Sequence, residues 1–185
     1  MKIALLGYGK MGRVIEQIAL DRGHEIVARI DLLNKDERAK ITPETADAVI
    51  EFSSPHSAYE NLKYCMENGL KTVSGTTGWL EHRSEIEALC NENNAAFFYA
   101  SNFSIGVNLF FKLNKQLAKL MSNQADYELV TYEIHHTEKK DSPSGTAITL
   151  AEGIMQENTS KTKWINNELP TEASEVPIWS SREGK

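Results

Sequence analysis

The sequence has little cysteine, no excess of positive charge and no long hydrophobic run. Cys65 and Cys90 are the only two thiols in 185 residues, and each sits in a segment with helical periodicity, so we expect free thiols rather than a disulfide. The net charge of -6 argues against a nucleic-acid surface, because binding to a polyanion depends on phosphate neutralisation. The early apolar stretch Ile3–Leu6 is too short for a signal-peptide core, and no later run approaches the ~20 residues of a membrane span. We therefore expect a cytoplasmic protein that binds neither nucleic acid nor membrane.

The first hundred residues alternate short apolar runs with helical stretches, a pattern typical of parallel βαβ units. It predicts an α/β fold of the Rossmann type, with a doubly wound parallel sheet. The expected strands are Ile3–Leu6, Glu25–Ile30, Asp47–Phe52, Lys71–Ser74 and Ala95–Tyr99. The expected helices are Lys10–Arg22, with Met11, Val14, Ile15, Ile18 and Ala19 on one face, then Pro55 to Gly69, with Ala58, Leu62, Cys65 and Met66 inside, and Glu81–Asn93.

After Asn102 the elements become longer. Ile105–Ser122 reads as one long helix and Asp126–Ile134 as a strand of alternating character. A helix at Thr146–Asn158, a polar loop over 159–175 and a strand start at Val176–Ser181 follow. We place the domain boundary so that 1–104 form the first domain and 105–185 the second, an incomplete α+β domain whose sheet should be open and partly antiparallel.

The segment Gly7-Tyr8-Gly9-Lys10-Met11-Gly12 fits the pattern GxGxxG between a strand and a helix. The first glycine allows the tight turn, the second lets a pyrophosphate approach the backbone, and the third permits close packing of helix on strand. Amides at the helix start then face the anion. The alternative is a tight turn that binds nothing.

Asp31 follows the second strand, nineteen residues after Gly12, where a carboxylate can accept hydrogen bonds from the adenosine ribose. Its neighbour is Leu32 rather than an arginine, and a carboxylate repels a 2′-phosphate, so we expect NADH to be preferred over NADPH. Arg29, Asn34 and Lys35 leave NADPH possible. A solvated loop acid is the alternative interpretation of Asp31.

Other loops end strands on the same side of the predicted sheet, where ligands of open α/β folds bind. Gly75, Thr76, Thr77 and Gly78 suit a loop that passes close to a nicotinamide ring, although a plain turn has the same composition. The segments Phe52–Pro55 and Ala100-Ser101-Asn102-Phe103 could complete the wall, and for these a structural role is an equal alternative.

The segment Glu133 to Ala147, EIHHTEKKDSPSGTA, gathers the most polar chemistry in the chain. Backbone amides at a helix start in Ser144-Gly145-Thr146 would form an anion site, with hydroxyls as further donors. Lys139 and Lys140 precede it on the same loop. His135 and His136 add groups that serve as acid, base or neutral donor near neutral pH. A carboxylate could meet both a cation and a helix end here.

A metal site built from the same histidines and Asp141 is the competing interpretation. Adjacent strand residues point to opposite faces, so His135 and His136 would chelate one ion poorly. The sequence also lacks HExxH and paired-cysteine spacing. We therefore predict no metal.

Together these segments resemble the 4-hydroxy-tetrahydrodipicolinate reductases, also called dihydrodipicolinate reductases, of bacterial lysine and diaminopimelate biosynthesis. The similar segments are GYGKMGR, FSSP, SGTTGW, ASNFSIGVN, EIHHTEKKDSPSGTA and WSSREGK. The resemblance implies reduction of a cyclic, unsaturated dicarboxylate with NADH or NADPH by a homotetramer that assembles through the second domain, which also binds the substrate.

The resemblance also implies residue roles. His135 corresponds to the general acid/base and Lys139 to the proton donor that assists hydride addition. The substrate carboxylates would meet His136, Ser144, Gly145 and Thr146. The cofactor wall would comprise Gly7, Tyr8, Gly9, Lys10, Met11, Gly12, Asp31, Gly75, Thr76, Thr77, Ala100, Ser101, Asn102 and Phe103.

Two features depart from the family. Some relatives carry an arginine where this chain has Leu32, which weakens an NADPH assignment. The family also continues for about sixty residues beyond an REGK-like segment, so we expect a truncated chain with impaired assembly and activity. A dinucleotide-binding sensor or assembly module without turnover, and an NAD-dependent dehydrogenase of another small acid, are the alternative functions.

Overall fold

The computed structural model describes residues 1–184, and the chain divides into two compact units, Met1–Ser101 and Asn102–Lys185. They are called the first and the second unit below. Each has its own sheet and its own hydrophobic core. The expected truncation point is Lys185, and this residue lies outside the described residues. No helix in residues 1–184 is both long enough and apolar enough to cross a bilayer.

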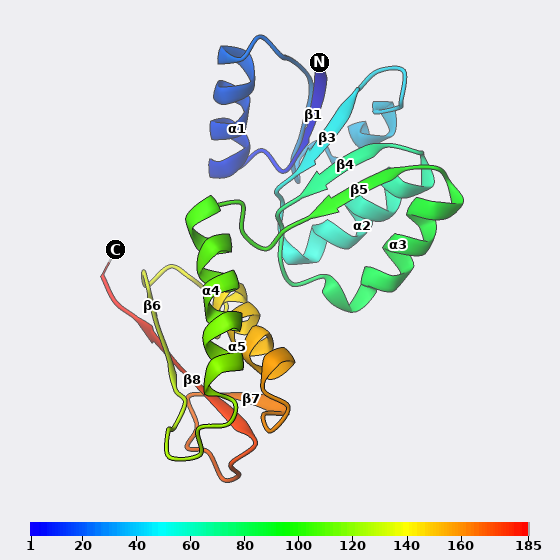
Figure 1. Ribbon diagram of the computed structural model, residues 1–185. Helices are drawn as coiled ribbons and strands as arrows, with labels where there is room; N and C mark the ends of the chain where they lie inside the picture. Colours follow the sequence, from blue (N-terminus) through cyan, green and yellow to red (C-terminus); the bar gives the residue numbers. More distant parts are fainter. Residues whose placement is uncertain (185) are drawn as a thin grey trace. The chain divides into compact units, whose positions relative to one another are not determined.

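The first unit is built on a five-stranded sheet in the order β2-β1-β3-β4-β5, and its neighbouring strands are all parallel (Figure 1). This confirms the predicted Rossmann-type sheet. The strands are β1 (Lys2–Leu6), β2 (Glu25–Ile30), β3 (Ala48–Glu51), β4 (Lys71–Ser74) and β5 (Ala96–Tyr99). The helices are α1 (Lys10–Asp21), α2 (Pro55–Glu67) and α3 (Arg83–Glu92), with short 3-10 turns η1 (Lys35–Lys40) and η2 (Leu80–His82).

The two faces of this sheet have separate cores. Alternate residues of β1 point to opposite faces, so Ile3 and Leu5 pack with α1 while Ala4 and Leu6 pack with α2 and α3. Helix α2 buries the predicted inner stripe completely, since none of its members has accessible surface. These are Ala58, Leu62, Cys65 and Met66.

The predicted apolar face of α1 is only half buried. Ile15 and Ala19 pack on the sheet, whereas Val14 and Ile18 stay about half exposed, as does Met11. The helix meets the sheet along a single row of side chains one turn apart, and the neighbouring row points outward. The prediction of one five-residue inner stripe is therefore wrong for this helix.

The second unit consists of α4 (Ile105–Met121) and α5 (Gly145–Glu157), which lie side by side (Figure 1), and a three-stranded sheet. The strands are β6 (Thr131–His135), β7 (Lys163–Asn166) and β8 (Glu175–Arg182), in the order β6-β8-β7. Both pairings are parallel. The expectation of a partly antiparallel sheet is therefore wrong for the described strands. Helix α5 lies in the connection from β6 to β7, and residues 167–174 join β7 to β8.

Two elements of this unit differ from the predictions. The strand expected over Asp126–Ile134 begins only at Thr131, because its partner β8 pairs with it from Ile178 to Arg182. The loop expected over 159–175 contains β7, which pairs with the first half of β8. Alternating polarity indicated where a strand could form, and the length of each strand follows from the residues that pair with β8.

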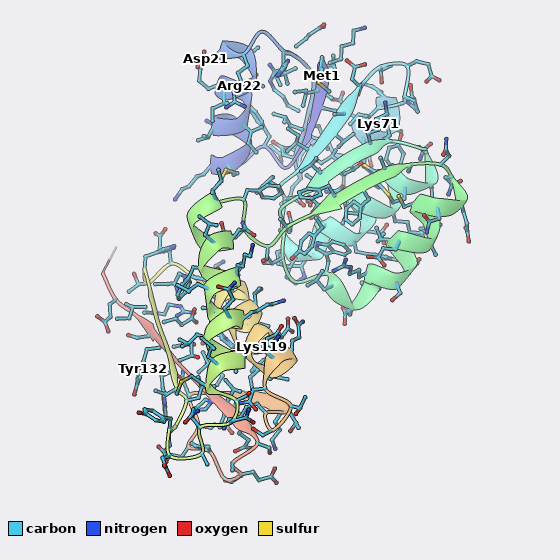
Figure 2. The ribbon with its side chains drawn as sticks, viewed as in Figure 1. Met1, Asp21, Arg22, Lys71, Lys119 and Tyr132 are labelled. Atoms are coloured by element: carbon cyan, nitrogen blue, oxygen red, sulfur yellow. The ribbon has the colours of Figure 1, made fainter. Side chains whose placement is uncertain are left out.

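One face of the second sheet is covered by the helices. Val176 and Ile178 of β8 pack in the core with Ala151 and Ile154 of α5. On β6 the odd-numbered residues are partly buried, whereas Ile134 and Tyr132, which is labelled in Figure 2, are largely exposed. Because strand residues alternate, the odd positions of β6 share the face that carries the core.

Candidate functional site

A pocket of about 1090 Å³ opens at the carboxyl ends of β1, β2 and β3 in the first unit. We call it the nucleotide pocket. Its lining includes most of the predicted glycine loop, the residues after β2 and the residues after β3: Gly7, Tyr8, Gly9, Lys10, Met11, Asp31, Phe52, Ser53 and Ser54. Three segments that are far apart in the sequence thus meet at one edge of the sheet, where open α/β sheets bind ligands.

The glycine loop fits a pyrophosphate for steric reasons that differ by position. Gly7 has φ of +99°, and a Cβ atom there would lie 2.0 Å from the Phe52 carbonyl oxygen. A Cβ on Gly12 would lie 2.2 Å from the Gly7 carbonyl oxygen, so this glycine lets α1 start close to β1. A Cβ on Gly9 would meet nothing within 4 Å and would only occupy pocket space. The residues present therefore fit a dinucleotide held against the backbone.

Asp31 is exposed at the pocket wall, in a turn stabilised by its own neighbours. Its Oδ1 accepts a hydrogen bond from the Leu33 amide at 2.7 Å, and its amide donates to Asn34 Oδ1 at 2.8 Å. The Arg29 side chain is engaged by Glu16, because its Nε donates to Glu16 Oε1 at 2.8 Å. That hydrogen bond lowers the pKa of Glu16 and raises the pKa of Arg29. Arg29 is thus held by Glu16, whereas Lys35 lines the pocket.

The other predicted parts of the cofactor wall lie outside the lining of this pocket. A Cβ on Gly75 would lie 2.1 Å from the Phe52 ring, so this glycine makes room for that ring. Thr76 is buried and accepts a hydrogen bond from the Ser53 amide at 2.8 Å. Thr77 lies in the same loop. Ala100 and Ser101 follow β5, and Asn102 and Phe103 belong to the second unit. Their role as cofactor contacts stays a prediction.

In the second unit, β6 ends at His135 and leads into the lysine loop. The His135 side chain is about one-third exposed, and its Nδ1 lies 3.4 Å from Glu133 Oε2. His136 is exposed. Lys139 Nζ lies 2.8 Å from Asp141 Oδ1. Burial raises the pKa of Asp141, but the hydrogen bond and positive charge of Lys139, a backbone hydrogen bond and the charge of Arg182 together outweigh it, so the pKa is lower than usual.

The predicted anion site lies at the start of α5. Ser144 is the N-cap, and its Oγ accepts a hydrogen bond from the Ala147 amide at 3.1 Å. Ser144 is buried, and both its amide and its hydroxyl donate to Glu133. These donors hold the helix start in place. The amides of Gly145 and Thr146 come from the first turn of α5, where no preceding turn supplies an acceptor, so they can face an anion.

Comparison with known proteins identifies the family. Residues 1–103 match the model described as "Dihydrodipicolinate reductase, N-terminus", and residues 106–185 match "Dihydrodipicolinate reductase, C-terminus". This chain belongs to the dihydrodipicolinate reductase family. The members of this family are oxidoreductases that depend on NADH or NADPH and serve lysine and diaminopimelate biosynthesis.

Individual relatives agree with the family models. The 4-hydroxy-tetrahydrodipicolinate reductase of Christiangramia forsetii is 44% identical over 183 residues, which are 99% of this chain and 75% of the relative. That of Methanocaldococcus jannaschii is 40% identical over 152 residues, 81% of this chain and 48% of the relative. The dipicolinate-bound dihydrodipicolinate reductase of Paenisporosarcina sp. TG-14 superimposes with a TM-score of 0.68 at 25% identity, over 98% of this chain and 78% of that one.

Two carboxylates with little or no accessible surface were not predicted from the sequence. Glu51 ends β3 without accessible surface and accepts hydrogen bonds from the hydroxyls of Ser74 at 2.6 Å and Thr76 at 2.9 Å. It also accepts from Ser53. Glu133 lies two residues before His135 on β6, and only 8% of its side chain is exposed. A glutamate inside an otherwise apolar strand, as in Val49-Ile50-Glu51, was the signal that could have identified Glu51.

Proposed function

We propose that this chain reduces 4-hydroxy-tetrahydrodipicolinate to tetrahydrodipicolinate with NAD(P)H. The observation that carries the proposal is the presence, in one chain, of a glycine-lined nucleotide pocket and of the His135–Lys139 loop beside an anion-binding helix start. Both segments lie within the matched family models. The dipicolinate bound by the Paenisporosarcina relative is a dicarboxylate, which supports a substrate of the same class here.

Each group then has a chemical task. Gly145 and Thr146 bind a substrate carboxylate through backbone amides, and His136 contributes a further polar contact. The nicotinamide, when bound, supplies the hydride. Lys139 donates the proton that accompanies hydride addition, and Asp141 holds its ammonium group in place at 2.8 Å. His135 acts as general acid/base. These preorganised charges stabilise the charge that develops on the substrate.

The first test removes the proton-handling groups. His135→Ala and Lys139→Ala should each lower kcat by ~10²–10⁴-fold, the usual contribution of general acid–base catalysis. The measurement is NADH oxidation with freshly generated 4-hydroxy-tetrahydrodipicolinate. Matched controls are His24→Ala and Lys119→Ala, which should keep their turnover. Variants that fold and still turn over would contradict these roles, and a parent protein that binds NADH without any turnover would favour the non-catalytic sensor.

We further propose that NADH is preferred. Asp31 lines the nucleotide pocket, its neighbours Leu32 and Leu33 are exposed apolar residues, and Arg29 is held by Glu16. A 2′-phosphate would meet a like charge at Asp31. Comparison of kcat/KM for NADH and NADPH tests this. Equal or better use of NADPH would refute the preference, and in that case Lys35→Ala should remove the NADPH activity because Lys35 lines the same pocket.

We also propose that the protein is a cytoplasmic homotetramer that assembles through the second sheet. The exposed side of β6 supports such an interface, since Tyr132 and Ile134 are 73% and 64% exposed. The free thiols Cys65 and Cys90 support a reducing compartment. Light scattering on the protein should give the mass of a tetramer, and charged residues placed at positions 132 and 134 should reduce that mass.

A further inference from the structure

We propose that Glu133 is a positioning residue of the reaction, which fixes the ring of His135 and the anion-binding start of α5 relative to each other. The proposal rests on the function proposed above and adds a residue to its machinery. The carboxylate is largely buried, since 8% of the Glu133 side chain is exposed. It acts through the two groups that it holds.

Strand geometry brings the parts of this cluster together. Glu133 and His135 are two residues apart on β6, so they share the face that is covered by the helices. On the neighbouring strand β8, Ser180 lies opposite Glu133 and Arg182 lies opposite His135. Helix α5 begins on the same face, with Ser144 at its N-cap. One carboxylate therefore reaches two strands and a helix end.

The contacts of the Glu133 carboxylate are all with donors. Oε1 accepts from the Ser144 amide at 2.8 Å and from the Ser180 hydroxyl at 2.8 Å, and lies 3.7 Å from Arg182 Nη2. Oε2 accepts from the Ser144 hydroxyl and lies 3.4 Å from His135 Nδ1. An ionised carboxylate accepts at both oxygens, whereas a glutamine of the same shape would place an N–H₂ group against one set of donors.

Charge on Glu133 agrees with this arrangement. Only 8% of its side chain is exposed, and this burial raises the pKa of Glu133. The hydrogen bonds from Ser144 and then Ser180 more than offset the burial, so the pKa lies below its usual value. The carboxylate is thus ionised at neutral pH and offers negative charge to His135 and Arg182. Buried charges of this kind persist where donors surround them.

The consequence for His135 concerns which nitrogen faces the ligand. Nδ1 is buried and makes no hydrogen bond among the described residues, and Glu133 Oε2 lies 3.4 Å from it. An N–H directed at a carboxylate is favoured over a lone pair directed at it, so the neutral ring should carry its proton on Nδ1. The exposed third of the side chain then presents Nε2 as the free acid/base position.

Arg182 extends the same network to the lysine loop. Its Nε donates to the Lys139 carbonyl oxygen at 3.2 Å, and Nη2 donates to the Asp141 carbonyl oxygen. The guanidinium is also the cation nearest the Glu133 carboxylate among the contacts described above. Glu133 therefore influences three parts of the proposed substrate site: the His135 ring, the α5 start and, through Arg182, the backbone that carries Lys139.

The experiment compares Glu133→Gln and Glu133→Asp with Glu128→Gln, an exposed glutamate of the same unit that serves as the matched control. NADH binding to the first unit should be unchanged in all of them. In Glu133→Gln, kcat should fall about 10- to 100-fold, a part of the contribution usual for general acid–base catalysis, with a smaller change in KM. Glu133→Asp should recover part of this loss. Unchanged kcat in a folded Glu133→Gln variant would overturn the proposal.

Two further readouts separate this inference from the proposed activity. Nitrogen-detected NMR of His135 should show the Nδ1–H tautomer in the parent and a shift toward Nε2–H in Glu133→Gln. Calorimetry should show weaker binding of dipicolinate by that variant. If the parent binds dipicolinate but turns over no substrate, the proposed function fails while these two readouts still decide the role of Glu133. An identical tautomer and identical dipicolinate affinity in both proteins would refute it.

Discussion

At the scale of single residues, Glu51 shows how one carboxylate can shape a ligand pocket that it does not line. It is fully buried, and its oxygens accept hydrogen bonds from Ser53, Ser74 and Thr76. Ser53 lines the nucleotide pocket, and Thr76 lies in the loop after β4. Glu51 thus connects the loops that follow two adjacent strands, and its side chain sets the position of the Ser53 backbone.

Replacement of Glu51 should therefore affect both stability and nucleotide binding. Glu51→Ala leaves buried donors without an acceptor, at a cost of ~1–3 kcal/mol for each donor that finds no other partner. We expect a lower Tm and weaker NADH binding, measured by thermal unfolding and by nicotinamide fluorescence. Glu67→Ala, at an exposed glutamate of α2 outside the pocket lining, is the control. A Glu51→Ala protein with the parent's Tm would contradict this account.

At the scale of elements, the contribution of α2 to the free energy of unfolding depends on how its side chains pack. Leu62 has no accessible surface in the core between α2 and the sheet. Leu62→Ala should lower the free energy of unfolding by ~2–5 kcal/mol, because it removes buried methyl groups and leaves a cavity. Val14→Ala on α1 is the control, since Val14 is 54% exposed and should change stability by about 0.5 kcal/mol or less. Denaturant unfolding of both variants checks the contrast.

The same elements show which parts of the fold could be predicted. Helix α2 carries a complete apolar stripe after Ser54 and Pro55, and both its start and its inner face were predicted from local signals. Strand β7 is four residues long and partly polar, so periodicity cannot distinguish it from a loop. Its formation depends on β8, which is a tertiary partner. The parallel direction of the second sheet depends on the same pairing.

The candidate site likewise has parts that local sequence patterns predicted and parts that depend on tertiary contacts. The glycine loop and the histidine–lysine segment are local patterns, so spacing alone indicated them. Glu51 and Glu133 also contact residues that are distant in the sequence, since Ser74 is 23 positions from Glu51 and Ser180 is 47 positions from Glu133. Such contacts are set by strand order and register, which the sequence analysis had only in part. Ser144 shows the reverse case, since its pattern was noticed but its donors serve Glu133.

At the scale of the whole molecule, an acidic protein with net charge -6 must hold anionic ligands by local groups. In the second unit, its carboxylates also stabilise the fold. Lys163 Nζ lies 2.9 Å from Glu175 Oε1, and the Thr171 and Glu172 amides donate to Oε2 at 2.6 Å and 3.2 Å. These contacts, with Lys163 the largest, lower the pKa of Glu175 to about 2. Strands β7 and β8 are joined at this pair.

The sign of the resulting pH dependence follows from that depressed pKa. An unfolded glutamate titrates near ~4.3, so the contribution of Glu175 is present above that pH and is lost as the pH falls toward 2. Thermal unfolding of the parent between about pH 6 and pH 2.5 should show a Tm that decreases as acid is added.

Two variants test whether Glu175 causes this decrease. Glu175→Gln should have a lower Tm than the parent near neutral pH, and its Tm should decrease less as acid is added, because glutamine takes up no proton at this position. Lys163→Met should keep Glu175 but raise its pKa, so its Tm should fall at a higher pH than that of the parent. Parallel curves for the parent and Glu175→Gln would mean that acid sensitivity arises elsewhere, with the Glu133 cluster, whose carboxyl pKa is also lowered, as the next position to test.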